Sequence, residues 1–169
     1  MTQRPARRVN SDVRALPLLT RASAFDKALR EIAVPALAQH GFAFDGKRTF
    51  RRVSDAPRVS DIINFQLGQR SMSAKFTVNL GIFAEGDAPG VSVGQAKEYD
   101  YLTQRRTRIG SLMLKSPTLS KLPWVGFLFG VPDKWWWFSE TYAQTRASVT
   151  AAVETLVTTG VGWFATNRP

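Results

Sequence analysis

The sequence contains no cysteine and a single histidine, His40. Without thiols there can be no disulfide, no cysteine nucleophile and no zinc–thiolate site. One imidazole also excludes a multi-histidine metal centre, and any serine–histidine pair would have to use His40. That residue falls in the last turn of a predicted helix, where a capping or packing role is expected.

Acidic residues are scarce as well, with 13 Asp plus Glu against 23 Lys plus Arg and a formal net charge of +10. The carboxylates are scattered singly, and the nearest pairs are Glu85 with Asp87 and Glu98 with Asp100. Neither pair is typical of acid–base catalysis or of a metal site. The sequence therefore predicts no catalytic residue, metal or cofactor, and its basic excess indicates an acidic partner.

Long apolar runs are also missing. The first one, Ala15–Leu19, is broken by Pro17 and is too short for a secretory signal. Residues 119–138 are apolar overall but contain Lys121, Asp133 and Lys134, so they do not form a membrane-spanning helix. A cytoplasmic protein without membrane insertion is expected.

The positive charge is concentrated towards the ends of the chain. Residues 1–58 hold 12 basic and 5 acidic groups, residues 59–100 hold 3 and 5, and residues 101–169 hold 8 and 3. Residues 1–20 are predicted to be a basic flexible tail, either solubilising or an arm for nucleic acid or a membrane surface. Residues 21–169 are predicted to be one α+β domain.

A helix is predicted over residues 23–40. Phe25, Leu29 and Leu37 share an apolar face at helical spacing, and Ser23 is the expected N-cap. Gly41 can adopt the left-handed conformation that ends a helix. Pro35 is expected to kink or split this helix.

Three runs with period-two alternation follow, at residues 47–53, 59–67 and 74–83, with a turn at 54–57. They predict an antiparallel meander with one buried face, on which Asp61 is out of character. Residues 85–94 read as a loop, a further strand is expected around 105–109, and residues 117–132 are expected to be irregular.

A second helix is predicted from Ser139, its cap, to Thr159, with Gly160 as its stop. Its expected buried stripe is Tyr142, Arg146, Val149, Val153, Leu156 and Val157. The whole pattern predicts an α+β fold in which an antiparallel sheet of about 5–6 strands carries the N-terminal and C-terminal helices on one face.

The opposite face of this sheet is the first candidate binding surface. It should carry Thr49, Arg51, Asn64, Gln66, Lys75, Thr77 and Asn79. Asparagine is depleted in strands, so several amides beside cations suit hydrogen bonding to a polar partner. An ordinary solvated sheet face is the alternative.

Arginines and tryptophans provide two further candidates. Arg105, Arg106 and Arg108 could hold a carboxylate or phosphate. In an extended Trp135–Phe138 run, Trp135 and Trp137 lie on one face and the other two rings on the opposite face, so one pair fills the core and the other lies at a surface or groove. The candidate ligand- or partner-binding residues are Arg51, Asn64, Gln66, Lys75, Asn79, Arg106, Arg108, Trp135 and Trp136.

Several short motifs occur in a characteristic order. They are Gly41-Phe42, residues 46–52 (GKRTFRR), 63–66 (INFQ), 76–83 (FTVNLGIF), 106–110 (RTRIG), Trp135-Trp136 and 160–164 (GVGWF). Over residues 23–165 the chain resembles the bacterial domain of unknown function 4304. The resemblance implies a small single-domain bacterial protein with no established activity, and it favours Asn64, Gln66, Asn79 and Arg108 over their neighbours.

The expected function is a non-enzymatic binding or accessory module, of the kind an immunity protein exemplifies, which docks on another protein or an anionic ligand. One alternative is a nucleic-acid-associated protein that uses the basic tail and the Arg and Trp surface. Another is an enzyme in which Arg51, Lys75 or Arg108 holds an anionic small molecule.

Overall fold

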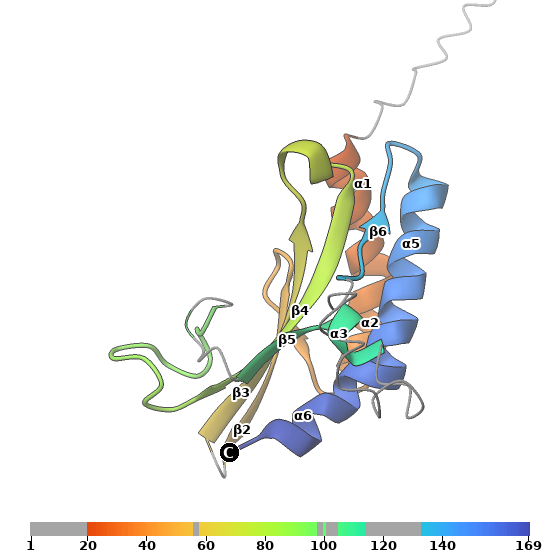
Figure 1. Ribbon diagram of the computed structural model, residues 1–169. Helices are drawn as coiled ribbons and strands as arrows, with labels where there is room; N and C mark the ends of the chain where they lie inside the picture. Colours follow the sequence, from red (N-terminus) through yellow and green to blue (C-terminus); the bar gives the residue numbers. More distant parts are fainter. Residues whose placement is uncertain (1–19, 56–57, 98–99, 101–104, 114–132) are drawn as a thin grey trace, which may run out of the picture.

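The computed structural model describes residues 20–55, 58–97, 100, 105–113 and 133–169 (Figure 1). Residues 1–19 of the predicted tail, the tip of the turn at 56–57 and the predicted irregular segment up to residue 132 lie outside these ranges, whereas Thr20, predicted as the last residue of the tail, belongs to the folded part. The elements are α1 Arg21–Ala28, η1 Leu29–Ala33, α2 Val34–Ala38, β1 Ala43–Phe44, β2 Thr49–Asp55, β3 Arg58–Leu67, η2 Arg70–Met72, β4 Lys75–Ala84, β5 Arg106–Arg108, α3 Ile109–Met113, β6 Trp136–Trp137, α5 Tyr142–Thr155, η4 Leu156–Gly160 and α6 Val161–Asn167.

The first helix is continuous from α1 through α2 and contains a π-helical turn. Its N-cap is Thr20, whose hydroxyl accepts from the Ser23 N–H at 3.2 Å, so Ser23 lies inside the helix and is not the predicted cap. Val34 N–H donates to the Leu29 carbonyl five residues back, directly before Pro35. Pro35 has no N–H to donate, and the widened turn is how the helix passes it without breaking.

The sheet has six antiparallel strands in the order β1-β2-β3-β4-β5, and β6 also pairs with β4. β3 pairs along the whole of β4, so the short strands β5 and β6 share the other edge of β4. β2 ends at Asp55 and β3 begins at Arg58, and these two residues pair with each other. The predicted antiparallel meander is confirmed.

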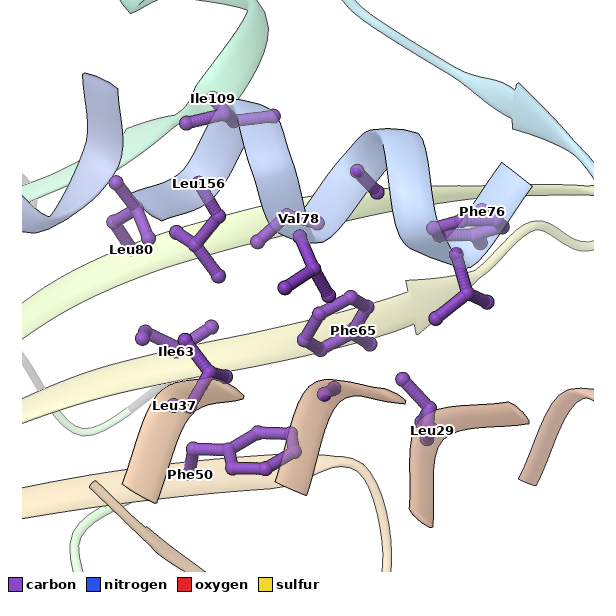
Figure 2. Packing of buried hydrophobic residues seen from close by; sticks show 14 of the residues in the cluster. Leu29, Leu37, Phe50, Ile63, Phe65, Phe76, Val78, Leu80, Ile109 and Leu156 are labelled. Atoms are coloured by element: carbon purple, nitrogen blue, oxygen red, sulfur yellow. The ribbon is translucent and has the colours of Figure 1, made fainter. Parts of the chain in front are cut away.

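The core lies between one face of this sheet and the two helices (Figures 1 and 2). Alternate residues of β3 and β4, such as Ile63, Phe65, Val78 and Leu80, are fully buried there. Leu29 of the first helix packs on the same cluster. The α+β fold, with an N-terminal and a C-terminal helix on a sheet of six strands, is therefore observed.

The second helix differs from its prediction at both ends. It begins at Tyr142 after the N-cap Thr141 and runs through a π turn to Asn167, so Gly160 does not end it. A Cβ on Gly160 would lie 2.6 Å from Leu156 Cδ1 and 3.0 Å from Ile109 Cδ1. A side chain at this position would therefore crowd Leu156 of the same helical turn and Ile109 of α3. Arg146 is exposed and is not part of the buried stripe.

Two segments between β4 and α3 complete the fold. Residues 85–97 fold over one end of the sheet face that is opposite the helices. There a small buried cluster is formed by Ile62, Phe83, Val93 and Ala96. The strand expected around 105–109 is present but stops at Arg108, and a helical turn begins at Ile109.

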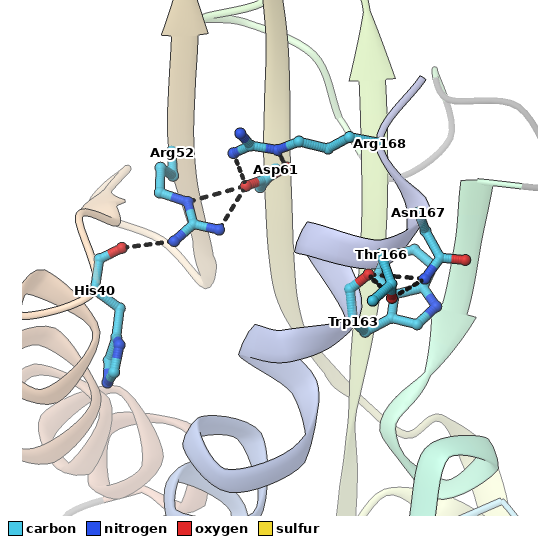
Figure 3. Close-up of polar contacts among 7 residues, drawn as sticks. All are labelled: His40, Arg52, Asp61, Trp163, Thr166, Asn167 and Arg168. Atoms are coloured by element: carbon cyan, nitrogen blue, oxygen red, sulfur yellow. Dashed lines mark hydrogen bonds and ion pairs between the residues drawn. The ribbon is translucent and has the colours of Figure 1, made fainter.

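The out-of-character Asp61 is fully buried beside two arginines (Figure 3). Arg52 donates through Nε and Nη2 to Asp61 Oδ2 at 2.9 and 2.8 Å, and Arg168 donates through Nε to Oδ1 and through Nη2 to Oδ2, at 3.2 and 2.5 Å. Arg52 also donates to the His40 carbonyl at 3.0 Å. The hydrogen bond to Asp61 holds the pKa of Arg168 above its ordinary value. The cluster ties both helices to the sheet.

Candidate functional site

A polar row crosses four strands on the sheet face opposite the helices. Thr49 of β2 pairs with Asn64 of β3, Asn64 pairs with Asn79 of β4, and Asn79 pairs with Arg108 of β5. Cross-strand partners project from the same face of a sheet, so the four side chains stand side by side. We call these four residues the polar row.

Hydrogen bonds connect the polar row from end to end. Arg108 Nε donates to Asn79 Oδ1 at 3.2 Å, and Asn79 Nδ2 donates to Asn64 Oδ1 at 3.5 Å. Asn64 Nδ2 in turn donates to Thr49 Oγ1 at 3.2 Å. Asn79 Nδ2 also donates to the neighbouring Gln66 Oε1 at 2.8 Å. Thr49 and Asn64 are only 6% and 8% exposed, so the row is held in place rather than loosely solvated.

A groove of about 920 Å³ opens at the Thr49 end of this row. The β1–β2 turn forms one wall and the end of β3 forms another. Its lining is Asp26, Asp45, Gly46, Lys47, Arg48, Thr49, Arg51, Asn64, Phe65, Gln66, Leu67, Gly68, Gln69 and Lys97. Four of these residues are basic and two are acidic, so the groove carries a positive excess.

Both carboxylates of the groove are paired with arginine. Arg48 donates through Nε and Nη2 to Asp26 at 2.9 and 3.2 Å, and Arg51 Nη1 donates to Asp45 at 3.3 Å. Asp45 Oδ1 also accepts the backbone N–H of Lys47 at 2.8 Å, which shapes the β1–β2 turn. Arginine therefore neutralises both carboxylates, and these ion pairs support the groove wall.

Two tryptophans extend the polar face beyond β4. Trp137 is 64% exposed, and the ammonium of its cross-strand neighbour Lys75 lies 4.1 Å from the centre of the indole ring. Half-buried Trp135 lies 5.9 Å from the Arg108 guanidinium, which also pairs with Asp133. Exposed indole rings beside cations are typical of interaction hot spots.

The structure brings most of the predicted site residues together on this face. Trp136 is the exception: it is 7% exposed and stacks on Phe76 in the core, so it does not belong to the binding surface. Its exposed neighbour Trp137 takes that place, as the alternation of the run allowed. Arg51 Nε donates to the Ala96 carbonyl at 2.8 Å and so anchors the segment of residues 85–97 to the sheet. This structural role was not predicted from the sequence.

Of the predicted arginine group, Arg105 and Arg106 have different surroundings. Arg105 Nη1 donates to both carboxylate oxygens of Asp87 at 2.9 Å and so fixes the segment after β4. Arg106 is exposed on the polar face, next to the polar row. Lys47, Arg48 and Lys97 line the groove but were not predicted as site residues. Lys47 and Arg48 belong to the basic run that leads into β2, and no sequence signal pointed to Lys97.

Comparisons with known proteins add no assignment. No protein-family model matches the chain, and neither the curated proteins nor the solved structures contain a match to it. In the part of the chain that the structure describes, no three His, Cys, Asp or Glu side chains are grouped to hold a metal ion. Across the same ranges no helix has the length and apolar character needed to cross a bilayer.

Proposed function

We propose that the protein is a cytoplasmic, non-enzymatic binding module that docks through its polar sheet face on an acidic segment of another protein. The observation that carries this proposal is the surplus of hydrogen-bond donors along the groove. Its two carboxylates are paired with arginine, while Lys47 Nζ and the Gln66 amide nitrogen have no side-chain partner among the described residues.

Carboxylates are the partner groups that this donor surplus suits. They offer only acceptor atoms at neutral pH, and hydrogen bonds between charged groups are about twice as strong as neutral ones. The face supports a segment rather than a small molecule, because exposed Trp137 and half-buried Lys75 lie on the same sheet face as the polar row but outside the lining of the groove. Rings of this kind anchor protein interfaces.

Nucleic acid is the second candidate, and Trp137 is the observation that favours it. An exposed indole beside Lys75, with Trp135 beside Arg108, is also suited to stacking nucleobases near a phosphate backbone. Binding of this type would weaken steeply with salt because neutralised phosphates release counterions.

The test compares three fluorescein-labelled probes by anisotropy: a ten-residue oligoglutamate, a ten-residue oligolysine and a ten-nucleotide single-stranded DNA. We expect the oligoglutamate to bind most tightly. Lys47→Glu in the groove should weaken its binding about tenfold, whereas Arg146→Glu on the exposed side of α5 changes the net charge equally and should have little effect. Tighter binding of the DNA, lost in Trp137→Ala, would replace the proposal by its alternative. Equal effects of the two charge reversals would contradict both site assignments.

We also propose that the chain is related to the domain of unknown function 4304. The order of its motifs supports this, and three of these motifs supply Asn64, Asn79 and Arg108 of the polar row. A solved member of that family should then carry the same three residues in register across β3, β4 and β5. A different register in that structure would contradict the proposed relationship between this chain and the family.

A further inference from the structure

The hydrogen bonds of the polar row all run in one direction, and Arg108 sets that direction. A guanidinium can only donate, so the atom of Asn79 that faces Arg108 Nε must be its oxygen. The Asn79 amide nitrogen then faces the other way, towards Gln66 and Asn64. The oxygens of those two amides must accept from it, which turns their own nitrogens away from Asn79.

The same constraint continues to the groove. Asn64 Nδ2 donates to Thr49 Oγ1, so the Thr49 hydroxyl is already an acceptor in this contact and keeps its proton for another partner. No acceptor for that proton lies among the described residues. Gln66 is in the same position, because its oxygen is used by Asn79 and its nitrogen remains. Both residues line the groove, and Thr49 is more than nine-tenths buried.

We infer that Thr49 and Gln66, with the ammonium of Lys47 in the same groove, form an oxyanion subsite, and that Arg108 is the positioning residue that gives this subsite its preference for anions. This inference deepens the proposed function, on which it rests, by naming the group of the partner that the groove binds: a carboxylate or phosphate oxygen. Both donors and the cation line this groove, the side-chain oxygens of Asn64 and Gln66 face Asn79, and the Asp26 and Asp45 carboxylates are paired with arginine.

An isosteric substitution of Asn79 can reverse the direction of the hydrogen bonds in the polar row. In Asn79→Asp, a carboxylate replaces the amide, and it accepts from Arg108 as before. It can no longer donate to Gln66 and Asn64, so both amides are expected to turn their nitrogens towards it and their oxygens outward. The Thr49 hydroxyl then donates to Asn64 and loses its free proton. In this variant an anion in the groove would face amide oxygens at the positions where the wild type presents hydrogen-bond donors.

The control must separate this reversal from the added negative charge. Arg106→Gln makes the same net change from an exposed position next to the polar row. The substituted residue, Asn79, lies two strands from Thr49, about 10 Å at the usual strand spacing. Since the Debye length is about 3 Å at 1 M salt, measurements at high salt remove most of the direct effect of a distant charge but preserve the direction of hydrogen bonds.

The experiment titrates acetate, and separately inorganic phosphate, into the full-length ¹⁵N-labelled protein and follows the side-chain amide signals of Asn64 and Gln66 at high salt. In the wild type we expect saturable shifts of both signals. Asn79→Asp should weaken acetate binding about tenfold, because donors are exchanged for acceptors. Arg106→Gln should stay within about twofold, and Arg108→Lys, which keeps a donor at this position, should retain binding.

Several outcomes would overturn the inference: no acetate or phosphate response at Asn64 and Gln66, an Asn79→Asp variant that binds as tightly as the wild type, or an equal loss in Arg106→Gln. If Asn79→Asp does not fold, Arg108→Glu provides the same reversal from the other side of Asn79. Tighter binding of phosphate than of acetate would support the subsite but count against an acidic protein segment. Binding of oligoglutamate without a response to acetate would leave the proposed function intact and refute the subsite.

Discussion

Replacing Asp61 by asparagine is the sharpest test of how the fold is held together. The carboxylate is fully buried and accepts four guanidinium N–H bonds, at 2.9, 2.8, 3.2 and 2.5 Å. Asparagine keeps the shape but loses the charge and one acceptor. Removing one partner of a buried ion pair costs about 3–5 kcal/mol. Arg52 and Arg168 are about a quarter exposed and recover water, so we expect the lower end, about 3 kcal/mol.

The assay is urea unfolding followed by tryptophan fluorescence, with Arg168→Met as the matched variant. Arg168→Met leaves Arg52 on the carboxylate, so it should lower the free energy of unfolding by only about 1–2 kcal/mol. The double variant should be less destabilised than the sum of the two single variants, because both remove the same interaction. A loss below about 1 kcal/mol in Asp61→Asn, or strict additivity in the cycle, would refute the assignment of Asp61 as the tie between sheet and helices.

Three further predictions follow from burial, packing and ionisation. Trp136→Ala should cost about 3–5 kcal/mol of stability, whereas Trp137→Ala should change it little, as measured by urea unfolding. Gly160→Ala should destabilise by about 1–3 kcal/mol because its methyl group would crowd Leu156, whereas Gly162→Ala meets open space in a helix and should be neutral or stabilising. Tyr142 should titrate above its ordinary pKa of 10.0, because burial and then a carboxylate hydrogen bond raise its pKa. The stability this contributes is full below the ordinary pKa and is lost as the pH rises through the raised value.

Each of these has a clear contrary result. Equal losses at the two tryptophans would mean that the alternation of β6 is misassigned. A Gly160→Ala protein as stable as the wild type would show that η4 can move away from α3. Difference absorbance between the wild type and Tyr142→Phe isolates one tyrosine of three, and a titration at or below the ordinary pKa would contradict the partial desolvation of Tyr142 and its hydrogen bond to Glu31.

The architecture could be predicted because apolar and polar residues alternate along much of β3 and β4. The alternation is regular from Ile63 to Leu67 and from Lys75 to Ile82, and it indicates which face is buried. The same reasoning placed Trp135 and Trp137 on one face. The π turns at residues 29–33 and 156–160 could not be predicted in this way, since they depend on how each helix packs and, in the first, on passing Pro35.

The candidate site was predictable only in part. Asn64 and Asn79 were identified because amides are unusual in strands. Their connection to Arg108 depends on the pairing of β5 with β4, which brings together residues 29 positions apart. The groove needed the β1–β2 turn to meet the end of β3, and nothing in the local sequence around Lys47 or Arg48 indicates that contact.

The most direct test of the central claim is a ¹H–¹⁵N map of the protein with a glutamate-rich peptide. If the polar sheet face is the binding surface, the largest shifts should fall on the side-chain amides of Asn64, Gln66 and Asn79 and on the indole N–H groups of Trp135 and Trp137. Shifts confined to the exposed side of α5, or no shifts at concentrations where the peptide is bound, would contradict it.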